Sequence, residues 1–590
     1  MRKGFTVFLL VALLGFGTNF AQTVSVGDTL IIDGGLGTLN EAIIGDVDGS
    51  GNRIHSVYKL KLGTQYLVTA TINIAESVEL VAPTPGNTKE TRPPIVRGGL
   101  DESGTFIDLM LNVNAETWKA KNIWFSGINP SGDGGSWRHI DFNKDYGRFE
   151  WENCIFETPV SGWDFIRGLG NHEDWIFTDC KFRNVQRSGS TWSGQLLNTT
   201  LCDTLKFTNC TIYNLGWLNN ESGTYGNFYT EYDHCTFVNT SVHQFIMNQP
   251  IIAKVTNNLL INCHGWADGP VEISAHPDQE PHGIIHQFFM PDISQVDSMW
   301  NIRADGPKYD PDGDGTLTES ERAYALKNNN WFYTQPITDY WAAFDSLTPN
   351  PWMCNATKEF FVNNLVEKQF EIIGVLGNPD TTWTYAPHPL YVEESTYNEN
   401  PDFTNLANDD EFAANLAKMR ETETAEGLPY YYNGEGVDPA DPNSNLIFPW
   451  PLPEDFTYSN ATLLAASQGG FPLGDLNWYL DKKAEWEDWV TTDIEDSKTG
   501  TLPTAFSLNQ NYPNPFNPVT SISYTLTKNS HVELKVFNVL GAEVATLVNG
   551  QKIAGKYDVK FDAAKLSSGV YFYQLTSADQ TITRKMMLLK

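Results

Sequence analysis

Trp151-Glu152-Asn153-Cys154-Ile155-Phe156 is the stretch of sequence that decides the fold, because related hexapeptides recur along the chain. Three further copies keep the cysteine, at spacings of 26, 30 and 25 residues: Phe177-Thr-Asp-Cys180-Lys-Phe182, Phe207-Thr-Asn-Cys210-Thr-Ile212 and Tyr232-Asp-His-Cys235-Thr-Phe237. Copies without the cysteine occur at residues 120–125 and 255–260, and looser ones at 326–329 and 361–364. Short β-rich segments with a period in the twenties indicate a β-solenoid rather than a helical repeat.

The spacing within each copy predicts a bend. A large apolar residue is followed three positions later by the cysteine and two positions after that by a second large apolar residue. Inward-facing residues of a strand recur every two positions, so a step of three indicates a bend between two short strands. The residue types at the bend tolerate a left-handed backbone. They are Asn122, Asn153, Asp179, Asn209, His234 and Asn257.

A second polar column follows the first, and stacked asparagines can hydrogen-bond along a solenoid axis. Its members are Asn184, Asn214, Asn239 and Asn262. With these features the repeats resemble right-handed parallel β-helix proteins of the pectate-lyase-like superfamily. The resemblance implies an all-β, right-handed parallel β-helix over residues 22–490, with about eight coils between 118 and 366 and a weaker start from Val24. Adhesins, lyases and hydrolases share this fold, so it assigns no activity by itself.

The seven cysteines belong to a protein expected to leave the reducing cytoplasm, where disulfides form. The positions of four of them predict otherwise, because stacked cysteines can serve as small apolar core residues. We therefore expect Cys154, Cys180, Cys210 and Cys235 to be buried and unpaired. The state of Cys202, Cys263 and Cys354 stays open.

The N-terminus has the composition of a secretory signal peptide. Arg2 and Lys3 precede a short apolar run from Phe5 to Phe16, and cleavage is expected after Ala21, so residues 1–21 would be removed. The apolar run is shorter than the roughly 20 residues that cross a bilayer, and no later segment is suited to span one.

The formal net charge of −33 lies in the body of the protein, because residues 505–590 hold nine Lys and Arg against five Asp and Glu. An acidic body repels phosphate backbones, which excludes nucleic acid as a partner. The same charge favours cations such as calcium and disfavours unassisted binding of acidic polysaccharides.

Residues 310–321 predict a calcium site. Acidic residues occupy positions 1, 3 and 5 of a twelve-residue loop, Gly315 occupies position 6, and a glutamate closes the loop. This spacing closely resembles an EF-hand loop, which wraps six to eight oxygens around one calcium ion. The segment from Glu319 to Lys327 is expected to form a helix after the loop. The expected ligands are Asp310, Asp312, Asp314, the Thr316 carbonyl, Thr318 and Glu321. The similar stretch 46–50 lacks the closing acid and is interpreted as a polar turn.

Residues 491–504 have the composition of a linker, and short alternating strands follow to the end of the chain. These strands predict a small immunoglobulin-like β-sandwich over residues 505–590. The motif from Asn511 to Pro518, the turn at 537–541, the segment 566–571 and the lysine-ended tail resemble the type A sorting domain of type nine secretion. The resemblance implies the type nine secretion machinery as a partner and a secreted or cell-surface location.

Catalytic candidates are sparse, because the sequence has no nucleophile elbow, phosphate loop or zinc-binding His-Glu-x-x-His motif. Calcium-dependent lyases of this fold place a basic residue beside acids on one outer sheet, and Asp141, Asp164 and Arg167 are expected within a few coils of one another. The alternative is that these residues form ordinary surface salt bridges. Two functions stay open: contact with extracellular polysaccharide, with or without cleavage by a lyase or hydrolase, and a structural or adhesive surface role.

Overall fold

The computed structural model describes most of the chain. The described residues are 23–128, 138–160, 164–187, 195–199, 201–221, 227–241, 245–246, 252–263, 285–286, 323–345, 391–406, 410, 412–414, 416–417, 448–494, 506–526, 530–552, 555–577 and 580–589. The predicted signal peptide, the predicted calcium loop and Cys354 lie outside these residues.

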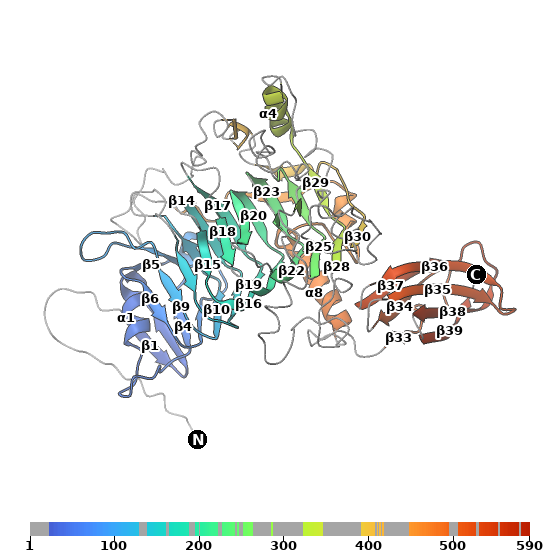
Figure 1. Ribbon diagram of the computed structural model, residues 1–590, viewed down its shortest axis with the longest axis horizontal. Helices are drawn as coiled ribbons and strands as arrows, with labels where there is room; N and C mark the ends of the chain where they lie inside the picture. The colour runs from blue at the N-terminus through green and yellow to red at the C-terminus, as the bar shows by residue number, and fades with distance from the viewer. Residues whose placement is uncertain are drawn as a thin grey trace, which may run out of the picture.

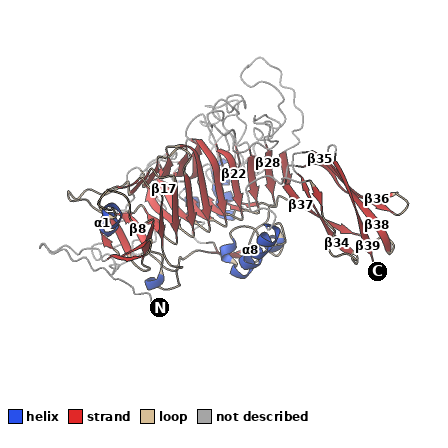
Figure 2. Cartoon of the chain, turned by 90° about the horizontal axis from the view of Figure 1, so that it is seen from below, coloured by secondary structure: helices blue, strands red, loops and turns tan. Residues whose placement is uncertain are grey.

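The described residues are mostly β, with 50% strand and 13% helix, and form a β-solenoid of about six turns followed by antiparallel sheets at the C-terminus. Figures 1 and 2 show the strands of successive turns stacked side by side and the C-terminal sheets beyond the end of the stack. The predicted all-β fold, a parallel β-helix followed by a small β-sandwich, is confirmed.

Three parallel sheets, named A, B and C, form the walls of the solenoid. Sheet A comprises, in order, β1 (Thr23–Val26), β2 (Thr29–Ile32), β4 (Val57–Leu60), β7 (Val78–Val81), β10 (Thr117–Lys121), β13 (Arg148–Glu152), β16 (Asn171–Thr178), β19 (Leu201–Thr208), β22 (Asn227–Asp233), β25 (Ile252–Thr256), β28 (Ala323–Lys327) and β30 (Tyr391–Glu394). Only β1 is antiparallel to its neighbour in this sheet.

Sheet B comprises β3 (Gly35–Leu36), β5 (Gln65–Val68), β8 (Ile95–Gly98), β11 (Trp124–Ser126), β14 (Ile155–Val160), β17 (Lys181–Arg187), β20 (Thr211–Leu215), β23 (Thr236–Thr240), β26 (Leu259–Ile261) and β29 (Asn330–Phe332). Sheet C comprises β6 (Ile72–Ile74), β9 (Leu111–Val113), β12 (Ile140–Phe142), β15 (Asp164–Gly168), β18 (Gln195–Thr199) and β21 (Trp217–Glu221). The remaining pairs are β24 (Phe245–Ile246) with β27 (Ile285–His286), and β31 (Phe403–Asn405) with β32 (Asp455–Tyr458). The helices are α1 (Thr38–Gly45), α4 (Gln335–Asp345), α8 (Leu480–Ile494) and the 3-10 turns η1 (Lys89–Thr91), η3 (Leu463–Ala465) and η4 (Leu476–Trp478).

The predicted bends lie where sheet A passes into sheet B. All six bend residues have a left-handed φ, between 51° and 63°. The Asn153 side-chain amide donates to Oδ1 of Asn122 at 2.7 Å, which links two successive turns. In the second column, Asn214 donates to Asn184 at 3.2 Å in the same way. The asparagine columns are thus confirmed, and these bonds satisfy part of the buried polar groups, although Asn209 Oδ1, Asn214 Oδ1 and Asn239 Nδ2 are buried without a hydrogen bond in the described part of the chain.

The core consists of stacked columns of like residues. The ring centroids of Trp151 and Phe177 are 4.5 Å apart, and those of Phe177 and Phe207 are 4.6 Å apart. The four ladder cysteines are buried and unpaired, as predicted. Cys202 and Cys263, left open by the sequence, are also buried and unpaired, whereas Cys354 lies outside the described residues.

One local prediction is wrong. Residues Ala323–Lys327 form strand β28 rather than the end of a helix, and Leu326 pairs with Val255 of β25. Leu326 is fully buried in the solenoid core. Burial of this apolar side chain in the next rung therefore outweighs the helical propensity of the segment.

Part of the predicted solenoid domain packs on the outside of the stack. The last described strand of sheet A is β30, and residues 448–479, which we call the strap, pack against outer residues of sheet B. Phe448 packs edge-to-face on Trp124 with centroids 5.3 Å apart, and the Trp450 indole donates to the Gly86 carbonyl at 2.7 Å. Buried outer residues of sheet B, such as Trp124, need an apolar cover, which the strap supplies.

Helix α8 follows the strap and continues to Ile494, four residues into the predicted linker. Lys483 Nζ lies 2.7 Å from Oδ1 of the bend residue Asp179, and Trp486 packs on the ring of the bend residue His234. The rest of the predicted linker lies outside the described residues.

The C-terminal sandwich has two antiparallel sheets. The first contains β33 (Ser507–Leu508), β34 (Val519–Leu526) and β37 (Gly555–Asp562); the second contains β36 (Glu543–Lys552), β35 (Ser530–Asn538), β38 (Gly569–Ser577) and β39 (Gln580–Leu588). Val532, Leu534 and Val536 face a core of their own, as their alternation predicts. Within the described residues, no helix has the length and apolar composition that a bilayer crossing requires.

Candidate functional site

The outer face of sheet C carries a row of polar side chains. Consecutive strands place Asn73, Asn112, Asp141, Arg167 and Asn198 opposite one another in register. Flanking residues on the same strands, such as Ile140 and Ile166, face the core, so the alternation of a strand turns the row outward. We call these five residues the polar row.

The sequence predicts only that Asp141 and Arg167 lie within a few coils of each other. In the structure they lie directly opposite each other in the register of β12 and β15. Oδ2 of Asp141 lies 3.0 Å from Nε of Arg138, and Oδ1 is buried without a hydrogen bond from the described residues. Burial raises the pKa of Asp141, although the nearby charges of Arg138 and Arg167 oppose the change.

Asp164 begins β15 and is 5% exposed. Its Oδ1 accepts a hydrogen bond from Nδ2 of Asn198 at 3.1 Å. Burial raises the pKa of Asp164 to about 6, against the opposing effects of Asn198 and Arg167. The protonation state of this carboxyl group therefore changes in a pH range close to neutral.

Arg167 is the half-buried cation of the face, and it forms no ion pair within the described part of the chain. Arg138, which was not among the predicted residues, forms the ion pair with Asp141. Sequence reasoning missed a role for Arg138 and Asn198, which contact Asp141 and Asp164. Alignment of the repeats could have identified Asn198, because the register places it directly opposite Arg167.

Two histidines near the row do not join it. His139 is fully buried and packs on Phe165 with ring centroids 5.0 Å apart, and burial lowers its pKa. His172 lies near the start of β16 in sheet A, where its Nδ1 is 2.9 Å from Oδ1 of Asp203. Neither imidazole therefore faces the carboxyl groups of Asp141 and Asp164.

The described residues contain no group of three His, Cys, Asp or Glu side chains that could hold a metal ion. Calcium prefers six to eight oxygens, whereas the polar row with the neighbouring Asp164 supplies two carboxyl groups, one of which already accepts an amide hydrogen bond. A tightly held calcium ion on this face is therefore poorly supported. The predicted ligands of the loop at 310–321 lie outside the described residues.

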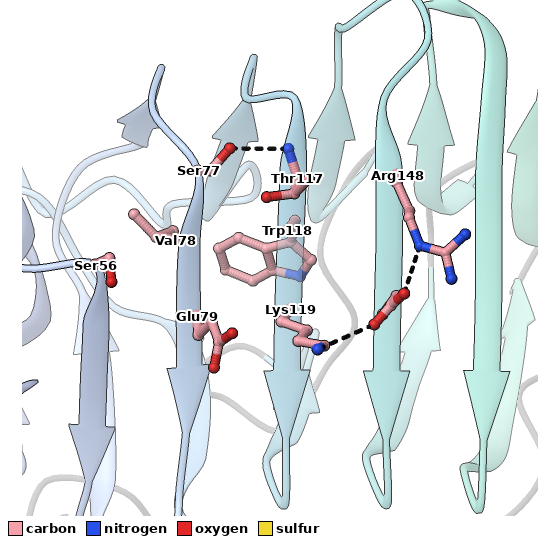
Figure 3. Close-up of a pocket in the computed structure, with 9 residues that line it drawn as sticks. Ser56, Ser77, Val78, Glu79, Thr117, Trp118, Lys119 and Arg148 are labelled. Carbon is pink, nitrogen blue, oxygen red and sulfur yellow. Dashed lines mark hydrogen bonds and ion pairs between the residues drawn. The ribbon is translucent and has the colours of Figure 1, made fainter.

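A shallow pocket of about 330 Å³ lies on the outer face of sheet A (Figure 3). Three of its charged side chains already pair with one another: Lys119 Nζ is 3.4 Å and Arg148 Nε is 2.5 Å from oxygens of Glu150. Trp118 is only 1% exposed and offers no ring face to a ligand. The pocket is therefore a weaker candidate than the polar row.

The features described define the class of protein: a parallel β-solenoid with an acidic body, whose chain continues into a separate antiparallel sandwich. Residues 510–589, within that sandwich, match the family model of the secretion system C-terminal sorting domain. The sorting domain predicted for residues 505–590 is therefore confirmed, and the protein is exported through type nine secretion and is secreted or held at the cell surface. No curated protein matches the chain.

Proposed function

We propose that this exported β-solenoid binds extracellular polysaccharide along the polar row of sheet C. The observation that carries the proposal is the register of five polar residues on five successive turns. Neighbouring strands repeat at about 4.8 Å, so the row is roughly 20 Å long. A linear, regularly spaced set of polar groups matches a linear polymer better than it matches a small molecule.

The chemistry of the row suits a hydroxyl-rich ligand. Sugar hydroxyls both donate and accept hydrogen bonds, and the row offers amide groups, carboxyl oxygens and one guanidinium. The charge of Arg167 acts on Asp141 and Asp164, but Arg167 makes no direct ion pair with a described residue, so its N–H donors can serve a ligand. The acidic body disfavours polyanionic glycans, so neutral glycans, or anionic ones bridged by calcium, are the expected ligands.

Calcium binding at residues 310–321 is part of the same proposal. Support comes from the sequence, because every ligand position of the twelve-residue loop carries a suitable oxygen. An ion bound there would reinforce the segment between β27 and β28, which precedes the final rungs of the solenoid.

Cleavage of the bound glycan is a second candidate function, in line with the resemblance to pectate-lyase-like proteins. The observation that favours it is the raised pKa of Asp164, about 6, beside a second carboxyl group with a raised pKa. A carboxylic acid that is partly protonated near neutral pH can donate a proton to a leaving sugar oxygen. Arg167 would be the base if the reaction were a lyase elimination.

A glycan array with and without calcium tests the binding proposal. Arg167→Ala is expected to weaken binding at least tenfold, whereas Lys121→Ala, which removes an exposed cation from the outer face of sheet A, should leave it unchanged. Assays for new reducing ends and for unsaturated uronide then separate hydrolysis from elimination, and Asp164→Asn should abolish either product. No binding by the folded wild-type protein would contradict the proposal and favour a structural or adhesive role.

A further inference from the structure

The N-terminal end of the solenoid holds a second group of reactive side chains, none of which belongs to sheet C. Ser25 Oγ lies 2.7 Å from Nε2 of His55, and Nδ1 of the same imidazole lies 2.7 Å from Oδ1 of Asp46. The three residues come from strand β1, the residues before β4 and the segment after α1 (Figure 1). From this arrangement we propose that Ser25, His55 and Asp46 form a serine-hydrolase triad that cleaves uncharged carboxylic esters.

The hydrogen-bond directions follow from the chemistry of the groups. An ionised carboxylate only accepts hydrogen bonds, so Nδ1 of His55 carries the proton and donates it to Asp46. Nε2 then has a free lone pair and accepts the hydroxyl proton of Ser25. This is the tautomer that a general base for serine requires, and such triads are recognised by geometry rather than by chain order.

Asp46 is held firmly in its ionised form. Burial raises its pKa, but hydrogen bonds to Oδ2 from the Tyr58 hydroxyl at 2.6 Å and the His55 backbone amide at 3.0 Å outweigh burial, so the pKa lies below its usual value. The Tyr58 hydroxyl also contacts the Arg53 guanidinium. Tyr58 is therefore a positioning residue, which fixes the carboxylate that orients the imidazole.

Catalysis needs an exposed nucleophile and a base that is shielded from solvent, and the three triad residues differ in exposure accordingly. His55 and Asp46 have side chains that are 8% and 4% exposed, whereas Ser25 is exposed on the edge strand of sheet A. Substrate can therefore reach the nucleophile while solvent is kept from the His55–Asp46 hydrogen bond.

The edge strand also supplies a donor for an oxyanion. Val26 and Thr29 flank the two-residue turn and lie opposite each other in register. In a two-residue hairpin this position is the hydrogen-bonded pair, and the next pair along the ladder, Ser25 with Leu30, is the non-hydrogen-bonded one. The backbone N–H of Ser25 consequently points away from β2 toward the open edge. A nucleophile's own N–H is one of the donors that stabilise the oxyanion in this chemistry.

The surroundings indicate the substrate class. Val24, Val26, Val47 and Ile54 are exposed apolar residues adjacent in sequence to the triad members, and Asp28 and Asp48 are the nearest exposed acids in sequence. Apolar contacts and negative charge favour an uncharged ester with a short acyl group and disfavour an anionic one.

The reaction balances without a cofactor. Ser25 Oγ attacks the ester carbonyl carbon as His55 Nε2 takes its proton; the C–O bond of the ester then breaks and His55 returns the proton to the leaving alcohol. Water attacks the resulting acyl-serine, His55 takes a proton from the water and gives it to Ser25 Oγ. The products are the alcohol and the carboxylic acid.

A fluorophosphonate probe and p-nitrophenyl acetate test this proposal on the purified protein. The probe should label Ser25, as located by peptide mass spectrometry, and ester hydrolysis should fall to background in Ser25→Ala and by roughly a hundredfold or more in His55→Gln. Asp46→Asn should lower kcat far more than it raises KM. Ser103→Ala removes an exposed hydroxyl bonded to Asp101 and should keep the full rate.

Melting temperatures close to the wild-type value would show that Ser25→Ala, whose site is an exposed strand edge, remains folded. An unlabelled Ser25 together with equal hydrolysis by wild type and Ser25→Ala overturns the proposal. The hydrogen bonds of His55 would then serve only to fasten β1 to the first turn. These assays use no glycan, so their outcome is independent of the proposal for the polar row.

Discussion

The hydroxyl of Thr211 in β20 donates a hydrogen bond to Oδ2 of Asp475 in the strap, with 2.6 Å between the oxygens and 264 residues of chain between the partners. Asp475 also accepts from the Asn477 backbone amide at 2.8 Å, and its own amide donates to Thr236 at 2.8 Å. Burial raises the pKa of Asp475 to about 7, although these hydrogen bonds and the charge of Lys181 oppose the change. One buried acid thus joins the strap to two turns of the solenoid.

Asp475→Asn should change how stability depends on pH. The folded pKa of about 7 exceeds the unfolded value of roughly 3.9, so the native state binds more protons between these values and wild-type stability falls as pH rises from about 4 to 7. The difference at this one site is on the order of 3 kcal/mol. The variant should lack this contribution. Its melting temperature relative to that of wild type should therefore increase as pH rises. If the melting temperatures of variant and wild type changed with pH in parallel, the raised pKa of the buried Asp475 would be contradicted.

Asn153 tests the bends. Asn153→Ala removes the hydrogen bond to Asn122 and also forces a Cβ-bearing, non-polar residue into a left-handed backbone with φ 51°, which costs about 1 kcal/mol or more. Asn153→Gly loses the same hydrogen bond without that strain. The alanine variant should therefore be less stable than the glycine variant in denaturant unfolding. Equal losses would mean that the hydrogen bond alone accounts for asparagine at this position.

The cysteine columns predict a thiol count. At least six free thiols should react with a thiol reagent in denaturant without reductant, because six described cysteines are buried and unpaired. The folded protein should react far more slowly, since the sulfur atoms are covered and burial raises the pKa of Cys180 and Cys235. A count below six would show that some of these residues form disulfides.

Calcium should raise the melting temperature, because a ligand that binds only the folded state stabilises it by about 2.7 kcal/mol at a hundred times its Kd. Glu321→Gln removes the closing carboxylate and should abolish most of this effect. Asp48→Asn is the matched control, since Asp48 lies in the similar turn at 46–50, where it accepts backbone hydrogen bonds from Ser50 and Asn52. Equal thermal shifts in the Glu321 variant and wild type would place the ion elsewhere.

Deletion of residues 505–590 should leave the protein in the periplasm of its own host, because the sorting domain occupies this segment. Fractionation and immunoblotting measure the outcome. The truncated protein should keep the melting transition of the solenoid, since the sandwich has a core of its own. Surface delivery of the truncated protein at the wild-type level would contradict the role of the domain.

Local patterns predicted much of the fold. The bends at Asn122 to Asn257 and the buried cysteines follow from residue types at fixed spacing, because each position repeats the same environment in the next turn. The strap did not follow, because its contacts, such as Trp450 with Gly86, join residues 364 apart and leave no periodic signal. Cys202 stayed open for a related reason: it lies outside the repeated hexapeptide, although the fold buries it in the same core.

Of the two candidate sites, the one within the regular repeats could be predicted from the sequence and the one in the first turn could not. Asp141 and Arg167 were expected near each other because they occupy equivalent positions in neighbouring repeats, and their register bears this out. Ser25, His55 and Asp46 come from the atypical first turn, where no repeat guides the alignment. The turn at 46–50 was interpreted only as polar, and nothing in the sequence indicates that Asp46 points toward an imidazole nine residues later.

The strap has a consequence for how the molecule unfolds. A solenoid whose turns touch only their neighbours behaves as a one-dimensional array and can fray from either end. Here Arg183 of β17 is buried between Glu157 of β14 and Glu454 of the strap, and Trp450 fastens the strap to the turn that contains Gly86. If one turn frays, it therefore loses its contacts with the strap, which also contacts distant turns. Early and late turns should melt together, and this cooperativity would protect an exported protein from proteases that attack partly opened chains.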